Sequence, residues 1–449
     1  MSESTSPSTP PTSPPSAGAG FNHRLMRMTG RDPGEAHRAA TPLELLFDLT
    51  FVVAFGQAGD QLAHLLAVGE VAAGIAAFVF AMFAICWAWI NFSWFASAYD
   101  TDDWFYRVTT MVQMVGVVVL ALGLPQLFAS VEHGGSFLIG GLVAGYVVMR
   151  IAMVAQWLRA AVQDQVRRRV ALTYACFVTA AQIGWVVLVI AAPDFITVLI
   201  VAVLLYLLEL GGPAFAETRL GGTPWNAAHI AERYGLLTII ALGEVLFGTV
   251  TSVSALVAEQ GWSVEAALVA VAGVGLTFGL WWTYFIIPSS AILRRYRGRA
   301  VVWGYSHVLL FASIAATGAG LHVVAYLIEG QAEIGVTGAI VSVAVPVLLF
   351  SVVLFLLYTY LVHEGDSFHV GLFAGTVATL VAAVWLAAAG GSLGVSLMLV
   401  TLSPAVVVVG YETVGYRHQA DVLARQLASA DGDSAGRGRA ARPRPGPNG

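Results

Sequence analysis

The chain has 449 residues, of which 58% are hydrophobic and only 11% are charged. A soluble domain has about 25% charged residues, so this chain cannot cover a globular surface with charge and must face lipid. This composition excludes a soluble enzyme, a secreted disulfide scaffold and a disordered chain. The formal net charge of −5 is spread over the whole length and gives no reason to expect a nucleic-acid partner.

Polar segments flank the apolar part of the chain. Residues 1–40 begin with a run of Ser, Thr, Pro, Ala and Gly, and residues 416–449 end in RPRPGPNG. Such compositions cannot bury a core, and the first segment has neither the charged start nor the apolar stretch of a signal peptide. We expect both segments to be disordered.

Apolar segments of about 20 residues recur between these ends, the length that a helix needs to cross about 30 Å of hydrocarbon. The strands of a β-barrel would instead alternate in short segments. The sequence therefore predicts an all-α membrane domain over 41–415. Its twelve expected spans lie near 43–67, 71–96, 107–129, 137–160, 170–192, 194–212, 227–252, 264–287, 300–327, 335–361, 370–389 and 392–412.

The arginines predict the orientation of these spans. They cluster before the first span, in the connections 4–5, 6–7 and 8–9, and in the tail, whereas connections 1–2, 3–4, 5–6, 7–8, 9–10 and 11–12 contain none. Because cytoplasmic loops are enriched in basic residues, we expect both termini in the cytoplasm.

A weak internal repeat suggests two six-helix halves of the same orientation, as in parallel-repeat transporters. Chance similarity between Leu-rich helices is the alternative. The matching residues, at shifts of 188 to 193, are Glu44, Leu49 and Thr50 with Glu232, Leu237 and Thr238, Trp89 and Phe92 with Trp282 and Phe285, and Arg107 with Arg299.

The first span carries four ionisable residues. Glu44 and Asp48 are four residues apart and share a helix face, and Asp60 and His64 form a second such pair nearer the other end. Asp48 and Asp60 are about 120° apart around a helix, so other helices must enclose this span. The alternative is that Glu44 lies among the headgroups and His64 caps the outer end, whereas for Asp48 we favour a buried, paired role.

The seventh span carries His229, Arg233 and, deep within it, Glu244. Arg233 and Glu244 share a face, but about 16 Å of helix separates them, so each needs a partner on another helix. The candidate partners are Glu44, Asp48 and Arg150, and a direct pair of Asp48 with Arg233 is one of the possibilities. A charge near the bilayer centre costs at least about 2.5–3.5 kcal/mol on insertion scales, which makes Glu244 a candidate for proton coupling. Structural ion pairs are the alternative.

The connection between spans 2 and 3 is acidic, with Asp100, Asp102 and Asp103 before Arg107. Three oxygens on a loop would make a weak metal site, so we expect a solvated cytoplasmic loop with local capping roles and no metal. The chain contains no phosphate loop, nucleophile elbow, zincin motif or dinucleotide fingerprint. We therefore expect neither enzymatic activity nor a cofactor.

The longest motifs are LELLFDLTFVVAFGQ at 43–57, YDTDD at 99–103, and HIAERYGLLTIIALGE at 229–244 followed by LWWTYF at 280–285. In these motifs the chain resembles the bacterial low temperature requirement protein A family, over about 41–415. The resemblance implies a multi-pass inner-membrane protein of bacteria and names no substrate. The family's pattern falls on Glu44, Phe47, Asp48, Gln57, Asp100, Asp102, Asp103, His229, Glu232, Arg233 and Glu244.

Together these features predict a protein that moves a small solute or ion through a site between its halves, with the lipid bilayer as its surroundings. The alternative is a structural or stress-related membrane protein whose buried charges are ion pairs that hold helices together. Neither the substrate nor the oligomeric state follows from the sequence. The candidate coupling residues are Glu44, Asp48, Gln57, Arg150, His229, Glu232, Arg233 and Glu244.

Overall fold

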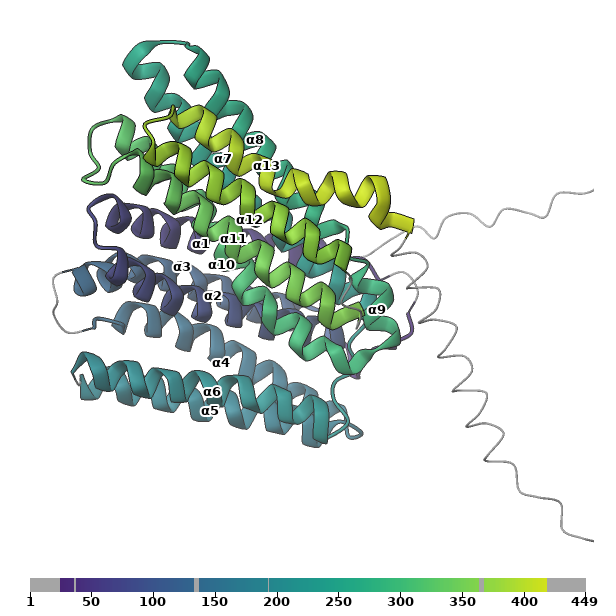
Figure 1. Cartoon of the computed structure of the whole chain (residues 1–449). Coiled ribbons are helices and arrows are strands. Elements are labelled where there is room, and N and C mark those ends of the chain that lie inside the picture. The colour runs from purple at the N-terminus through teal and green to yellow at the C-terminus, as the bar shows by residue number, and fades with distance from the viewer. Residues whose placement is uncertain (1–24, 36–37, 133–136, 193, 363–366, 418–449) are drawn as a thin grey trace, which may run out of the picture.

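Figure 1 shows the computed structural model, which describes residues 25–35, 38–132, 137–192, 194–362 and 367–417. The chain is 85% helical, and the described residues contain no strand. Within them, 12 helical segments are long and apolar enough to cross a membrane. The predicted all-α class and the predicted number of spans are therefore confirmed.

The helices follow one another through short connections, and α9 is a short helix that continues the eighth span. Their bounds are α1 (Pro42–Ala67), α2 (Val71–Tyr99), α3 (Trp104–Glu132), α4 (Gly140–Gln163), α5 (Arg168–Ala191), α6 (Phe195–Arg219), α7 (Ala227–Gln260), α8 (Val264–Phe285), α9 (Ser289–Arg295), α10 (Ala300–Ile328), α11 (Val336–Val362), α12 (Ser367–Ala388) and α13 (Leu393–Gly410), after which a single π-helical turn spans Tyr411–Gly415.

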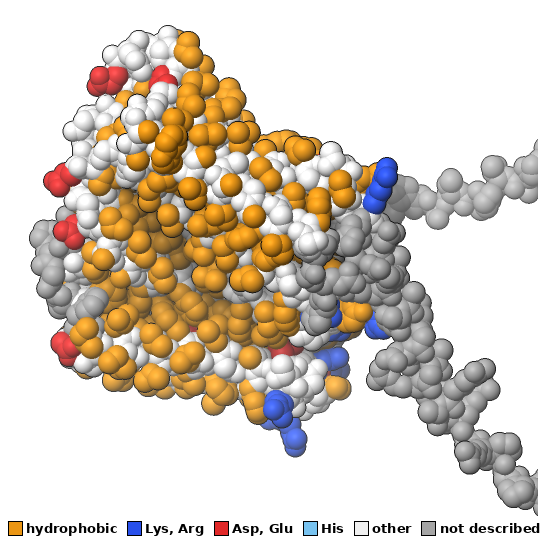
Figure 2. Space-filling view, in the orientation of Figure 1, with side chains coloured by type: hydrophobic (Ala, Val, Ile, Leu, Met, Phe, Trp, Pro, Cys, Tyr) orange, Lys and Arg blue, Asp and Glu red, His pale blue; other side chains and the backbone are white. Residues whose placement is uncertain are grey.

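Hydrophobic side chains cover the face of the bundle seen in Figure 2, with arginines near one end and acidic residues near the other. Many apolar residues in the middle of helices are exposed, such as Leu122 at 76% and Phe247 at 66%. A water-soluble protein would bury most of such side chains, whereas lipid accommodates them. The protein is thus a multi-pass helical membrane protein.

The two halves repeat the same helix neighbours. In the first half α3 packs on α1 and α4, and in the second half the corresponding α10 packs on α7 and α11. The successive pairs α4–α5 and α5–α6 likewise correspond to α11–α12 and α12–α13. These shared neighbours agree with two six-helix repeats, but the halves also differ, because α8 packs on α13 whereas α2 packs on α3 and α4. Helices α1, α2, α7 and α10 lie where the halves meet, because each of them contacts helices of the other half.

Glycines allow α3 and α4 to cross very closely. A Cβ atom added at Gly145 would lie 2.2 Å from the backbone nitrogen of Leu120, and one at Gly123 would lie 2.4 Å from the carbonyl carbon of Gly141. No side chain fits in such a space, so backbone packs directly on backbone. This contact keeps the first half compact around α3 and α4.

The described residues before α1 lie along one end of the bundle, which we name the terminal end. The backbone N–H of Met28 donates to Gln163 (2.6 Å), that of Arg31 donates to the carbonyl of Ala98 (3.0 Å), and buried Arg38 donates to carbonyls in the last turn of α2. These contacts hold 25–35 and 38–41 against the helices. Most of the segments that we expect to be disordered, residues 1–24 and 418–449, lie outside the described part of the chain.

Candidate functional site

The first turn of α1 fixes the position of Glu44. The backbone N–H of Glu44 donates to the Thr41 hydroxyl (3.2 Å), and Glu44 Oε2 accepts from the backbone N–H of Thr41 (2.8 Å). This is a capping box, which satisfies two free donors at a helix start. Across the gap to α7, His229 Nε2 lies 3.2 Å from the same Glu44 oxygen. Glu44 is therefore held from its own helix and from α7.

Arg233 of α7 lies between two carboxylates of α1. Its Nη1 is 3.0 Å from Glu44 Oε1, and its Nη2 is 2.5 Å from Asp48 Oδ1. The possible contact between Asp48 and Arg233 is thus present, and Glu44 is a second partner of the same guanidinium. All four side chains are fully buried, and we name Glu44, Asp48, His229 and Arg233 the α1–α7 cluster.

Helix α2 packs against this cluster and contacts Asp48 and Arg233. The indole N–H of Trp89 donates to Asp48 Oδ1 (2.6 Å), and Ser93 Oγ lies 3.4 Å from Arg233 Nη2. The Arg233 guanidinium also lies 5.7 Å from the ring centre of Trp89 and 5.9 Å from that of Phe92, within the range of cation–π attraction. The sequence marks Trp89 as a repeat match but does not indicate its bond to Asp48.

Several polar atoms in and beside the α1–α7 cluster have no hydrogen-bond partner among the described residues. They are Asp48 Oδ2, His229 Nδ1, Arg233 Nε and the hydroxyl of fully buried Tyr106 on α3, which lies within electrostatic reach of Glu44 and Arg233. Buried polar atoms are satisfied in the great majority of cases, because each unsatisfied one costs about 1–3 kcal/mol. A concentration of them in one place marks a cluster whose bonding can change.

Arg150, one of the three candidate partners for this network, lies in a different place. Its Nη2 is 2.9 Å from Glu209 Oε2 of α6 and 2.5 Å from the hydroxyl of Tyr146 on its own helix α4. The candidate link from Arg150 to the charges of α1 and α7 is therefore wrong, because Glu209 satisfies it within the first half. A glutamate inside an apolar span needs a partner, and that signal could have identified Glu209.

The other candidates on α1 and α7 lie outside the α1–α7 cluster. Gln57 is half-buried farther along α1, and exposed Glu232 lies 3.4 Å from the backbone nitrogen of Ala40. Glu244 lies in the middle of α7, with its carboxyl group beside Gly56 of α1. The expected pair of Asp60 and His64 is wrong, because His322 of α10 is the partner of Asp60, at 3.3 Å.

The acidic loop after α2 is more buried than expected. Asp102 is exposed and pairs with Arg107 at 2.8 Å, whereas Asp100 and Asp103 are buried. Asp103 caps α3 by accepting from the backbone N–H of Tyr106 (2.9 Å), as the expected capping role requires, and it also pairs with Arg159. The expectation of a solvated loop is wrong for these two carboxylates, because both are buried and Asp103 accepts hydrogen bonds from Met26 and from Arg159 of α4.

Their surroundings shift the pKa values of Asp100 and Asp103 in opposite directions. Burial, reinforced by the negative charge of Glu44, raises the pKa of Asp100 to about 6. Burial also acts to raise the pKa of Asp103, but its hydrogen bonds from Arg159 and from two backbone N–H groups outweigh this effect and lower it. The three aspartates thus bind different partners and do not converge on one point.

Twelve spans and a fully buried ionic cluster between two halves define a polytopic membrane protein with a polar interior. The sequence profile of the family described as bacterial low temperature requirement A protein (LtrA) matches residues 39–404. The chain therefore belongs to the bacterial low temperature requirement A family, as the resemblance implies.

Beyond the family, the chain is similar to an uncharacterized protein of Rhizobium meliloti (strain 1021). The two sequences are 27% identical over 210 residues, which are 45% of this chain and 48% of that protein. The similarity thus spans about half the length of each. No solved structure matches the chain.

Proposed function

We propose that the protein is a transporter of a small solute or ion, and not an enzyme, and that the α1–α7 cluster is its site. One observation carries the proposal: two fully buried carboxylates, Glu44 and Asp48, share the single guanidinium of Arg233. Two carboxylates beside one guanidinium leave one negative charge inside an apolar bundle, which a proton on His229 or on a carboxyl group, or a cation, would have to balance. Burial strongly disfavours such a charge, so the cluster favours a proton or a cationic group of a solute.

The position of the cluster supports this role. Glu44 and Asp48 belong to the first half of the chain, whereas His229 and Arg233 belong to the second half. In transporters built from repeats, the site lies at the interface between them, and movement of one half against the other exposes it alternately. Arg233 now contacts both Glu44 and Asp48. If α1 shifted along α7 by one helical turn, about 5.4 Å, Arg233 would contact only one of these two carboxylates.

We also propose that the terminal end faces the cytoplasm and that the bilayer is the bacterial inner membrane. The arginines of the connections between α4 and α5 and between α8 and α10 lie at this end, which agrees with the positive-inside rule. Cysteines introduced at Arg168 and at Gln260, in a chain without Cys86 and Cys176, test this orientation in whole cells. An impermeant thiol reagent labels position 260 from outside and leaves position 168 unlabelled; the reverse result would overturn the orientation.

A structural role is the second candidate, because buried ion pairs also hold helices together. The Arg150–Glu209 pair, which lies entirely within the first half, has this character. A purely structural protein would show no solute movement, and its α1–α7 cluster would affect only its stability.

A flux screen of the purified full chain in liposomes tests the transport proposal. Panels of inorganic ions, amino acids and organic ions are compared between wild type, Asp48→Asn and protein-free liposomes. We expect at least one class of solute to enter wild-type liposomes, and Asp48→Asn to abolish this entry. Glu259→Gln is the matched control, because Glu259 is an exposed acid at the far end of α7. Equal flux in wild-type and protein-free liposomes for every panel would contradict the proposal.

A further inference from the structure

Three helices cross closely at a place distinct from the α1–α7 cluster. A Cβ atom added at Gly318 of α10 would lie 2.7 Å from the backbone carbonyl of Glu244 on α7, and one at Gly248 of α7 would lie 2.5 Å from the carbonyl oxygen of Gly318. A Cβ atom at Gly56 of α1 would lie 3.0 Å from Glu244 Oε1. Glycine therefore allows α1, α7 and α10 to meet around Glu244.

On each of these helices an ionisable residue lies four residues, about one helical turn, from the glycine. These residues are Asp60 after Gly56, Glu244 before Gly248, and His322 after Gly318. Asp60 Oδ1 is 3.3 Å from His322 Nδ1, and Asp60 is the charged group that acts on Glu244. We name Asp60, Glu244 and His322 the glycine-crossing cluster.

The neighbours of Glu244 leave its carboxyl group without a fixed partner. Within the described chain, Glu244 makes no hydrogen bond and no ion pair. From α1 it faces Asp60, and from α10 the nearest ionisable groups are His322 and, one turn farther along, Tyr326, which acts on Asp60. Helices α2 and α8 also contact α7, but in the described chain they bring no charged group within reach of Glu244.

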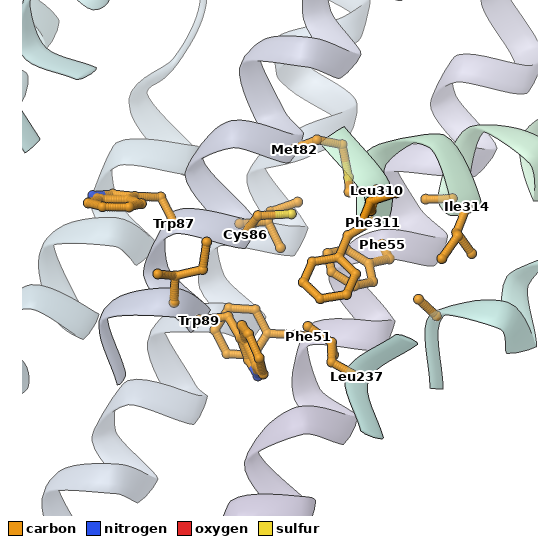
Figure 3. Packing of buried hydrophobic residues seen from close by; sticks show 14 of the residues in the cluster. Phe51, Phe55, Met82, Cys86, Trp87, Trp89, Leu237, Leu310, Phe311 and Ile314 are labelled. Carbon is orange, nitrogen blue, oxygen red and sulfur yellow. The ribbon is translucent and has the colours of Figure 1, made fainter. Parts of the chain in front are cut away.

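An apolar layer separates the two clusters. Figure 3 shows Phe51, Phe55, Leu237, Phe311 and Ile314 packed together, and all five are fully buried. The rings of Phe55 and Phe311 are 6.3 Å apart between their centres. On α1, eight residues, or about 12 Å of helix, separate Asp48 of the α1–α7 cluster from Gly56, and Phe51 and Phe55 lie between them. Polar groups on its two sides therefore do not communicate directly in this conformation.

The glycine-crossing cluster is open on its own side of the layer. The Asp60 side chain is 54% exposed and that of His322 is 19% exposed, whereas the α1–α7 cluster is completely buried. Asp60 lies seven residues, or about 10 Å, from the end of α1 that is opposite the terminal end. Asp60 and His322 are therefore the more accessible members of the cluster, and Asp60 lies toward that side.

We propose that the glycine-crossing cluster is a proton-binding site, in which Glu244 takes up and releases the proton and Asp60 with His322 exchanges it with water opposite the terminal end. A carboxylate and an imidazole are the side chains that exchange protons most readily near neutral pH. The closely packed glycines leave space for a proton but not for a solute. The inference rests on the proposed transport function, for which it identifies the proton as the coupling ion.

Proton binding can be measured without any transport. Infrared difference spectra of the full chain in lipid nanodiscs, recorded between two pH values, show the C=O stretch of a carboxyl group that becomes protonated. We expect one component of the titrating carboxyl signal of wild type to be missing in Glu244→Gln, while the component of Asp100, which Asp100→Asn identifies, remains. Glu259→Gln, which changes an exposed acid on the same helix, should keep the Glu244 component and its midpoint.

Two further variants keep the proposal testable if Glu244→Gln does not fold. Asp60→Asn removes the neighbouring charge, and Gly56→Ala places a methyl group against the Glu244 carboxyl while keeping every ionisable residue. Each should keep the Glu244 component and move its midpoint by about one pH unit, the usual size of a neighbouring-charge effect. An unchanged midpoint in both variants, or an unchanged carboxyl signal in Glu244→Gln, would overturn the site.

The side of access has its own test. Asp60→Cys, in a chain without Cys86 and Cys176, should be labelled by an impermeant thiol reagent from the same side of sealed vesicles as Gln260→Cys. Labelling from the side of Arg168→Cys, or from neither side, would overturn the proposed route. If the infrared component of Glu244 is present but no solute moves in the flux screen, the transport proposal fails and the proton site stands. If solute moves and the infrared component of Glu244 is absent, the proton site fails and the transport proposal stands.

Discussion

The protein buries two arginines in its helices, and their surroundings differ. Arg150 meets one carboxylate, that of Glu209, whose second oxygen accepts from Gln182 (3.3 Å) and from Trp185 (3.1 Å). The hydroxyl of Tyr146 donates to the first oxygen of Glu209 at 2.5 Å. One positive charge thus balances one negative charge, and both carboxylate oxygens are satisfied by helices of the same half.

Arg233 meets two carboxylates of the other half, and Asp48, His229 and Arg233 each keep an atom without a hydrogen-bond partner. Both sites bury their charges completely, so burial alone does not distinguish a structural ion pair from a functional one. The balance of charge does, whereas unsatisfied polar atoms do not, because Arg150 Nε and Gln182 Oε1 at the first site also lack a hydrogen-bond partner. The Arg150–Glu209 pair has one stable arrangement, whereas the α1–α7 cluster has more than one way to pair Arg233.

The largest effect on stability is expected from Arg150→Met. It leaves the carboxylate of Glu209 buried without its cation, and breaking a buried pair in this way costs about 3–5 kcal/mol. We expect little folded protein in membranes, measured by detergent extraction and size-exclusion chromatography. The double variant Arg150→Met with Glu209→Gln should recover most of the yield, because no buried charge is left. A normal yield for the single variant would show that the pair is not structural.

Asp48→Asn should destabilise the protein less than Arg150→Met, because Glu44 still pairs with Arg233. Arg233→Gln leaves the carboxylates of Glu44 and Asp48 buried without their cation and should cost about as much as Arg150→Met. Since Asp48 and Arg233 touch, their combined effect should differ from the sum of the single effects by about 0.5–3 kcal/mol. The thermal unfolding of the four proteins of the cycle measures this coupling. Strictly additive losses would contradict a direct interaction between Asp48 and Arg233. Glu44 would then be the partner of Arg233.

The stability of wild type should depend on pH through Asp100, beside the α1–α7 cluster. Burial and the charge of Glu44 raise the pKa of Asp100 from 3.8 to about 6, so folding favours its protonated form. This contribution is complete below about pH 4 and is lost as the pH rises through about 6. Asp100→Asn should therefore lose less stability than wild type between these values, in unfolding temperatures measured at each pH. Parallel curves for the two proteins would contradict this assignment.

The smallest effect on stability is expected from Thr41→Ala, which removes the hydroxyl that caps α1. Loss of such a cap costs about 1 kcal/mol. Ser263→Ala is the matched control, because Ser263 caps α8 in the same way, far from either arginine. Both variants should lose similar stability and keep wild-type flux, because the backbone N–H of residue 41 that donates to the Glu44 carboxylate remains in Thr41→Ala. Flux lost in Thr41→Ala alone would show that the capping hydroxyl itself positions Glu44.

The fold was largely predictable because it depends on local signals. Span number follows from the length and hydropathy of single segments, and the contact of Asp48 with Arg233 follows from the need of each buried charge for a partner. Charge spacing on one helix, however, does not identify partners on other helices. For that reason the sequence leaves Arg150 as a candidate for the α1–α7 cluster and places Asp60 beside His64 on one helix face, and it does not indicate the observed partners Glu209, Trp89 and His322.

The central claim is that the α1–α7 cluster carries transport and the Arg150–Glu209 pair does not. Flux per folded molecule, measured in liposomes for one double variant of each site, tests this claim most directly. The Arg150→Met, Glu209→Gln protein should transport at the wild-type rate, whereas the Asp48→Asn, Arg233→Gln protein should fold and not transport. Equal flux in the two double variants would contradict the claim.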